Sequence, residues 1–341
     1  MSRKRAAIGA LTAVLMLAAW GGTGVLGAAG RRTAALSIPP GKGVTHHGGG
    51  LRVQPATINP FKVFREALYQ DGGRGLRNQQ SGGLLISGVA GAPIKAYVYW
   101  AFITSGPAGP AQSGIRIQRL EPTKSGMKSL KGVVVGTGGT PCWGGDTITV
   151  FRAGVPLSVA SGNGSYEVGI LPGAAGSIAG EDPWAFAALP EAEGASLVIV
   201  YEAAGAVTSL FDVGLAGATF VSTPGLAYVL TLPAPAPGGS TLWDNIGADG
   251  QHGFSRMGVP GVANEDTTIN GVPVAGPGSD GNDSDWNGND STPIPSLWDT
   301  TGHDITSATP PGTATLKVSV AGPSGSGVDC LTPVANVVAE S

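Results

Sequence analysis

Charged residues are scarce in this sequence. Lysine, arginine, aspartate and glutamate together make up 13% of the 341 residues, about half the usual share in a globular protein. The formal net charge is only −3, so the composition offers neither the basic face typical of nucleic-acid-binding proteins nor a polybasic patch for a membrane surface. We therefore expect no nucleic-acid partner.

The apolar run near the N-terminus is too short to span a bilayer. Residues 6–20 form a run of 15 residues, whereas a spanning helix needs roughly 20. This run follows Arg3, Lys4 and Arg5 and precedes a series of small residues, which is the order of a secretory signal peptide. We predict a signal peptide over residues 1–29, export by the general secretory route, an extracellular or cell-surface location and no membrane span in the mature chain. The alternative is an uncleaved membrane anchor.

Cysteine is nearly absent, with two residues, Cys142 and Cys330. In an exported chain an even number of cysteines favours a disulfide. This bond would close a loop of 330 − 142 = 188 residues, and the chain-entropy model assigns such a loop roughly 4–5 kcal/mol of stabilisation. The alternative is a pair of buried free thiols.

Glycine and proline, in contrast, are abundant, with 57 and 26 residues. The glycines have no collagen-like period and lie between short runs of β-branched and aromatic residues, a pattern typical of strands joined by turns. We predict an all-β fold of one or two β-sandwich (jelly-roll-like) domains with long Gly/Pro/Asp-rich loops and one short N-terminal helix.

The helix is expected to begin at Asn59 and Pro60. Asparagine can accept hydrogen bonds from the first free backbone N–H groups, and proline is well tolerated at the first helical position. Phe61, Phe64 and Leu68 follow at helical spacing, and the Asp-Gly-Gly sequence after them would end the helix.

Strands are predicted from residue 82 onwards. Residues 94–103 are rich in aromatic and β-branched side chains, and residues 196–201 are apolar enough for a central strand that is buried on both faces. Glu191 and Glu193, just before this strand, are expected to lie in a loop. The other predicted strands are 84–86, 115–120, 132–135, 147–151, 166–171, 207–211, 218–221, 227–232, 314–320 and 331–338.

A weak internal echo divides these strands into two sets. A Thr-Ile-Thr run near residue 148 and an Asp-Ile-Thr run near residue 305 are each followed by a turn with proline and another strand. Each run is preceded by a tryptophan with an aspartate nearby, so we predict a domain boundary near residue 205. The predicted organisation is a signal peptide at 1–29, a flexible linker at 30–58, a first β-sandwich domain with its leading helix at 59–205, and a second with an Asp/Asn-rich loop at 206–341.

Several short motifs follow one another in a distinctive order. They are Lys-Ala-Tyr-Val-Tyr-Trp at 95–100, Pro-Cys-Trp at 141–143, Gly-Ser-Tyr-Glu-Val at 164–168, Ala-Ser-Leu-Val-Ile-Val-Tyr-Glu at 195–202, Leu-Trp-Asp at 297–299, Asp-Ile-Thr-Ser at 304–307 and Asp-Cys-Leu at 329–331. In this order the chain resembles, over roughly residues 82–338, a domain-of-unknown-function family of secreted and surface-anchored bacterial and archaeal β-sandwich proteins. The resemblance implies an extracellular β-sandwich and no known activity.

Residues 280–290 are the best candidate for a metal site, because four Asp and three Asn fall within eleven residues. Asp283, Asp285 and Asn287 alternate before a glycine, as the first oxygen ligands of a calcium loop do. Position 12 of such a loop is Ile294 instead of a glutamate, so further ligands would have to come from elsewhere. A solvated loop of Asx-turns is the alternative. The candidate Ca²⁺ ligands are Asp280, Asp283, Asp285, Asn287, Asn289 and Asp290.

No catalytic constellation stands out in the sequence. No serine lies in the Gly-x-Ser-x-Gly context of a nucleophile elbow. Glu167, Glu181, Glu202 and Asp212 could supply the paired carboxylates of a glycoside hydrolase, but separation in space is not readable from sequence. Enzymatic activity therefore stays open, and we favour a protein without it.

Trp286 and Trp298 lie in polar, loop-like surroundings and are candidates for stacking on sugar rings; the alternative is that they fill the ends of a sandwich. Our leading interpretation is a secreted or cell-surface, non-enzymatic β-sandwich protein with a structural or adhesive role and Ca²⁺ as its candidate stabilising ion. Surface glycans or other envelope proteins are the expected partners. The alternative is a secreted carbohydrate-binding module or glycan-active enzyme.

Overall fold

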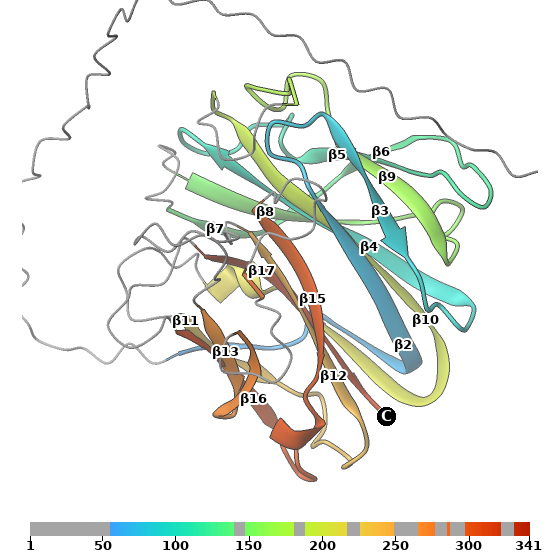
Figure 1. Cartoon of the computed structure of the whole chain (residues 1–341), viewed down its shortest axis with the longest axis vertical. Helices are drawn as coiled ribbons and strands as arrows, with labels where there is room; N and C mark the ends of the chain where they lie inside the picture. The colour runs from blue at the N-terminus through green and yellow to red at the C-terminus, as the bar shows by residue number, and fades with distance from the viewer. Residues whose placement is uncertain are drawn as a thin grey trace, which may run out of the picture. The chain divides into compact units, whose positions relative to one another are not determined.

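Strands make up almost all of the regular structure of this protein, as the composition predicts. The computed structural model describes residues 55–139, 147–180, 188–216, 226–248, 265–276, 285–286, 297–321 and 331–341. Within them lie 17 strands and two short 3₁₀ helices (Figure 1). The strands are β1 (Ala56–Ile58), β2 (Lys62–Gly75), β3 (Ser81–Ile86), β4 (Pro93–Thr104), β5 (Gly114–Arg119), β6 (Lys128–Lys131), β7 (Val133–Gly138), β8 (Thr147–Gly154), β9 (Gly164–Ile170), β10 (Glu191–Phe211), β11 (Leu226–Thr231), β12 (Thr241–Ala248), β13 (Asp266–Ile269), β14 (Val272–Ala275), β15 (Trp298–Asp304), β16 (Thr315–Ala321) and β17 (Thr332–Glu340). The 3₁₀ helices are η1 (Val213–Ala216) and η2 (Thr306–Ala308).

The largest sheet has the strand order β15-β12-β17-β10-β4-β8-β7, and β2 also pairs with β10. The long strand β10 organises it. Its first part pairs with β4, its last part with β17, and both parts pair with β2. The register with β2 shifts between Glu202 and Val207, and Gly205 there has a φ of +80°, a conformation that glycine adopts readily. The two parts of β10 thus join two halves of one sheet.

Three hydrophobic clusters fill the spaces around this sheet. The four-stranded sheet β3-β9-β5-β6 covers the first half, where Tyr166 packs with Leu197 and other residues. The five-stranded sheet β1-β11-β16-β13-β14 covers the second half, where Tyr228 packs with Trp243 and others. Between the two halves of the large sheet lies a third, central cluster that includes Val198 and Val337. Residues 196–201 are therefore buried on both faces, as predicted.

The predicted division near residue 205 falls inside β10. Strands from both sides of that position belong to the large sheet, and residues 53–341 form one compact unit. The boundary is therefore wrong as a division between separate sandwiches. The two sets of strands instead form two halves that share the large sheet, and a smaller sheet covers each half.

The predicted N-terminal helix is wrong, because residues 62–75 form strand β2. β2 pairs with β10 along nearly its whole length, and Ala67 and Tyr69 are buried two positions apart, the period of a strand. Gly72 continues the strand instead of ending a helix. A Cβ at this glycine would lie 2.6 Å from the backbone oxygen of Leu85, so only glycine allows this close approach.

Glu191 and Glu193 are not loop carboxylates as expected. They begin β10 and are almost inaccessible to solvent, with Arg77 between them. The Arg77 Nη2 atom lies 2.6 Å from Glu193 Oε1, and its Nε lies 3.8 Å from Glu191 Oε2. The positive charge of Arg77 compensates the two carboxylates, and this compensation allows them to be buried.

Further differences concern the chain ends and loops. The end of the predicted linker forms β1, which pairs with β11 in parallel. Residues 233–295, for which no strand was predicted, contain β12, β13 and β14. The predicted signal peptide and strand 218–221 lie outside the described residues. Within the described part of the chain, no helix has the length and apolar character needed to cross a membrane.

Candidate functional site

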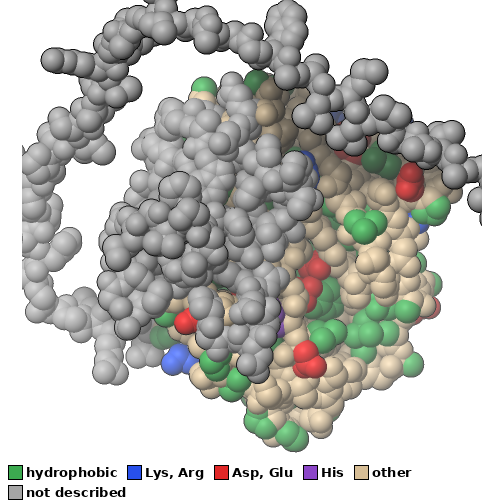
Figure 2. Space-filling view, viewed as in Figure 1, with side chains coloured by type: hydrophobic (Ala, Val, Ile, Leu, Met, Phe, Trp, Pro, Cys, Tyr) green, Lys and Arg blue, Asp and Glu red, His purple; other side chains and the backbone are tan. Residues whose placement is uncertain are grey.

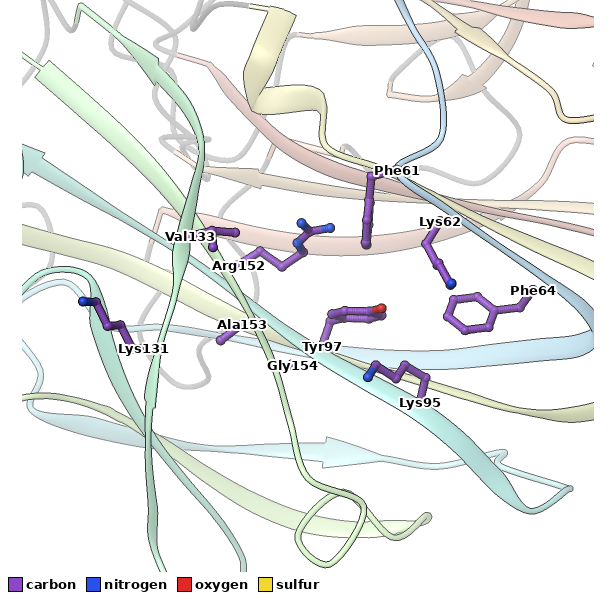
Figure 3. A pocket seen from close by; sticks show the side chains of 10 residues that line it. All are labelled: Phe61, Lys62, Phe64, Lys95, Tyr97, Lys131, Val133, Arg152, Ala153 and Gly154. Atoms are coloured by element: carbon purple, nitrogen blue, oxygen red, sulfur yellow. The ribbon is translucent and has the colours of Figure 1, made fainter.

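A groove with a volume of about 500 Å³ lies beside the first half of the large sheet. Figure 3 shows its lining side chains, which come from the start of β2 and the residue before it, from β4, from β8, from the end of β6 and from the start of β7. We call it the cationic groove, since it contains four basic side chains and no acidic one. Its lining residues are Phe61, Lys62, Phe64, Lys95, Tyr97, Lys131, Val133, Arg152, Ala153 and Gly154.

The groove is the open end of the central cluster. Side chains at alternate positions of a strand share one face. On β8, Ile148 and Val150 are buried in the central cluster, and Arg152 follows them on that face. On β4, Tyr99 is buried in the same cluster, while Tyr97 two residues earlier is only partly covered. A face that is apolar deep in the protein therefore becomes aromatic and basic at its rim.

Arg152 lies at the floor of the groove and is held on two sides. Its guanidinium carbon lies 3.4 Å from the centroid of the Phe61 ring, a cation–π contact, and the ring of Tyr97 meets that of Phe61 edge to face at 5.4 Å. On the other side, Arg152 Nη1 lies 3.3 Å from Asp212 Oδ2. The Tyr99 hydroxyl donates a hydrogen bond of 3.2 Å to Asp212 Oδ1.

The three lysines of the groove have exposed side chains. Lys62 Nζ lies 5.8 Å from the centroid of the Phe64 ring, and Lys95 Nζ lies 5.7 Å from that of Tyr97. None of the three forms an ion pair with another residue in the described part of the chain. Elsewhere charge is sparse, and on the face shown in Figure 2 the described surface is mostly uncharged. Lysines beside aromatic rings can contact an anion and an apolar face of the same ligand.

The composition-based expectation that the chain lacks a basic face thus does not hold locally. The basic residues of the groove are spread over some 90 positions of sequence, from Lys62 to Arg152. The one sequence signal for this groove is Lys95, which lies two positions before Tyr97 in a clearly predicted strand, so that both side chains share one face. Net charge averages over the whole chain and cannot report such clustering.

Of the predicted calcium ligands, Asp285 alone lies within the described residues; Asp280, Asp283, Asn287, Asn289 and Asp290 lie outside them. Asp285 is fully buried, and its Oδ1 lies 2.6 Å from Nε2 of His303. The ring of His303 stacks on Trp243, with centroids 5.8 Å apart. In the described part of the chain, no group of three His, Cys, Asp or Glu side chains is arranged to hold a metal ion.

The two tryptophans predicted to stack on sugars are buried, with 1% of Trp286 and none of Trp298 exposed. Trp298 packs against Gly194, where a Cβ would lie 2.3 Å from the indole, and its Nε1 donates a 2.9 Å hydrogen bond to Ser196 Oγ. Neither ring presents a free face, so the stacking hypothesis is corrected in favour of packing. Cys142 and Cys330 lie outside the described residues.

Of the acidic residues considered for glycoside hydrolysis, the three that the structure describes lie in different places. Glu167 is engaged in the sheet β3-β9-β5-β6, where its carboxylate accepts hydrogen bonds from Ser81 and Gln118. Glu202 is exposed at the register shift of β10, and Glu181 lies outside the described residues. Asp212 alone lies next to the groove, where it contacts the lining residue Arg152.

No family model matches the sequence, and no curated protein matches it. A solved structure that is similar to this chain is described as recombinant N-glycanase F (PNGase F). The two share 13% sequence identity with a TM-score of 0.26, over 81% of this chain and 96% of that one. A likeness at this level carries no argument about activity. Membership of the domain-of-unknown-function family stays a prediction.

Proposed function

We propose that this chain is an exported protein of the cell surface or its surroundings, with an adhesive, non-enzymatic role, and that it binds an acidic polysaccharide in the cationic groove. The observation that carries the proposal is the presence of Lys62, Lys95, Lys131 and Arg152 beside three aromatic rings in one open groove. Export is proposed from the N-terminal sequence pattern.

The chemistry of the groove favours a charged sugar polymer. The apolar faces of sugar rings stack on aromatic side chains, and carboxylate or sulfate groups accept charge-assisted hydrogen bonds from lysine and arginine. An open groove suits a linear chain that enters and leaves it, and its volume is within the range of small-ligand sites. Nucleic acid is the competing polyanion, and the binding experiment includes it.

Binding is expected to weaken about tenfold in a Lys62→Gln/Lys95→Gln/Lys131→Gln variant, because exposed charge contacts each contribute modestly. Calorimetry would measure the Kd of the full chain for polygalacturonate and for dextran sulfate at an ionic strength of about 0.05 M, where screening is weak. Neutral dextran is expected not to bind.

The matched control is Lys124→Gln/Lys128→Gln/Lys317→Gln, which removes the same charge from exposed lysines outside the groove. It is expected to leave Kd within about twofold of the unsubstituted protein. Equal weakening by both triple variants would reject the groove as the site. Tighter binding of single-stranded DNA than of either acidic polysaccharide would reject the ligand class.

We also propose that Ca²⁺ stabilises the loop at residues 280–290. Saturation of such a site at about one hundred times its Kd adds about 2.7 kcal/mol of stability, which raises the Tm of a protein of this size by several degrees. Thermal melting of the full chain in Ca²⁺ and in chelator measures the shift. We expect Asp283→Asn/Asp290→Asn to lose most of it, and an unchanged midpoint in the unsubstituted chain would contradict the proposal.

A further inference from the structure

Asp212 lies directly behind the floor of the cationic groove. It follows the last residue of β10, and its side chain is only 8% exposed. Its carboxylate has two partners, Arg152 on β8 at 3.3 Å and the Tyr99 hydroxyl on β4 at 3.2 Å. The guanidinium of Arg152 therefore links the carboxylate to the groove.

This contact cancels one of the four positive charges of the groove. The Arg152 side chain is 16% exposed, and Phe61 covers one side of its guanidinium. Arg152 therefore remains part of the floor, and its charge is balanced by a carboxylate that an incoming ligand does not reach. Of the four cations, only the three lysines are without a counter-charge among the described residues.

We infer that Asp212 is an affinity-determining residue of the cationic groove: it is a built-in counter-anion of Arg152, and removing its charge strengthens the binding of anions. The inference rests on the proposed function, in which the groove binds an acidic polysaccharide. With Asp212 neutral, the floor presents a fourth uncompensated charge directly beneath the ligand, in a site that is poorly screened by solvent.

The charge of Asp212 is expected to change in the mildly acidic pH range. Burial raises the pKa of this carboxyl to about 6, and Arg152 and the Tyr99 hydrogen bond oppose the shift without cancelling it. Among the described residues, Tyr97 on β4 is a further titratable group that interacts with it, and β7 and η1, which pack against each other nearby, carry no titratable side chain. Below its pKa the carboxyl is neutral, so anion binding is expected to become tighter as pH falls.

The test uses Asp212→Asn in the full chain, which keeps an oxygen acceptor for the Tyr99 hydroxyl. The Kd for dextran sulfate, whose sulfate esters stay charged, is measured at about pH 7.5 and about pH 5. We expect the unsubstituted protein to bind about fivefold more tightly at the lower pH. The variant is expected to bind with that higher affinity at both pH values. Glu121→Gln, an exposed carboxylate outside the groove, should behave as the unsubstituted protein.

Each outcome separates this inference from the proposed function. Absence of any polyanion binding by the unsubstituted protein would defeat the proposed function itself. Binding that the groove lysines control, but that neither Asp212→Asn nor the change of pH alters, would overturn the inference alone. The pH comparison on the unsubstituted protein needs no variant, so the inference remains testable even if Asp212→Asn does not fold.

Discussion

Replacing Trp298 by alanine is expected to lower the free energy of unfolding by about 3–5 kcal/mol. The indole is fully buried in the central cluster, between the two halves of the large sheet. It packs on the backbone of Gly194 and donates a hydrogen bond to Ser196. The substitution therefore leaves a cavity and removes one of the two hydrogen bonds of the Ser196 hydroxyl, which keeps its bond with Thr300 Oγ1. Urea unfolding followed by tryptophan fluorescence and circular dichroism measures the loss.

This experiment also separates packing from ligand stacking. A ring that stacks on a sugar would, when removed, weaken glycan binding and leave stability nearly unchanged. For Trp298→Ala we expect a large loss of stability and nearly unchanged glycan binding in the groove. Trp298→Phe should be intermediate in stability. The control is Leu242→Ala on β12, whose side chain is 39% exposed and whose removal should cost well under about 1 kcal/mol. Equal stabilities of Trp298→Ala and Leu242→Ala would show that the indole is not part of the core.

Replacing Arg77 by methionine is expected to cost about 3–5 kcal/mol, because it leaves two buried carboxylates without their common cation. Arg77, Glu191 and Glu193 are all almost completely inaccessible to solvent. The loss is measured by denaturant unfolding near neutral pH, where free carboxylates are ionised.

The control for this loss is Arg65→Met, the same change at an exposed position of β2, which should cost under about 0.5 kcal/mol. Adding Glu193→Gln to Arg77→Met should recover part of the stability, since it removes one buried charge. A double variant that is less stable than Arg77→Met would contradict the account of charge compensation.

The binding role proposed for the groove agrees with its position on paired strands. Lys95, Tyr97 and Arg152 lie on β4 and β8, which pair with each other in the largest sheet, and the deeper residues of the same face fill the central cluster. Side chains on such a scaffold hold their positions better than side chains on loops. The exposed lysines at the rim keep the freedom to adjust to a polymer.

The sequence by itself determined the all-β class and most strands, because the alternation of apolar and polar side chains is a local property. Residues 94–103 and 196–201 were predicted as strands and lie within β4 and β10. The helix expected at Asn59 was also predicted from local signals, but this prediction was wrong. Its capping signals were genuine local preferences, but pairing of β2 with β10 overrode them.

Only the tertiary structure decided which residues meet. Arg77 joins Glu191 and Glu193 across more than 110 positions of sequence, and Lys62 and Arg152 line one groove from two strands that are far apart along the chain. Such meetings depend on strand register and on which sheets stack, and neither is encoded in a short window of sequence. The sequence therefore determined what the strands are made of, while long-range pairing decided where charge is buried and where it is exposed in a groove.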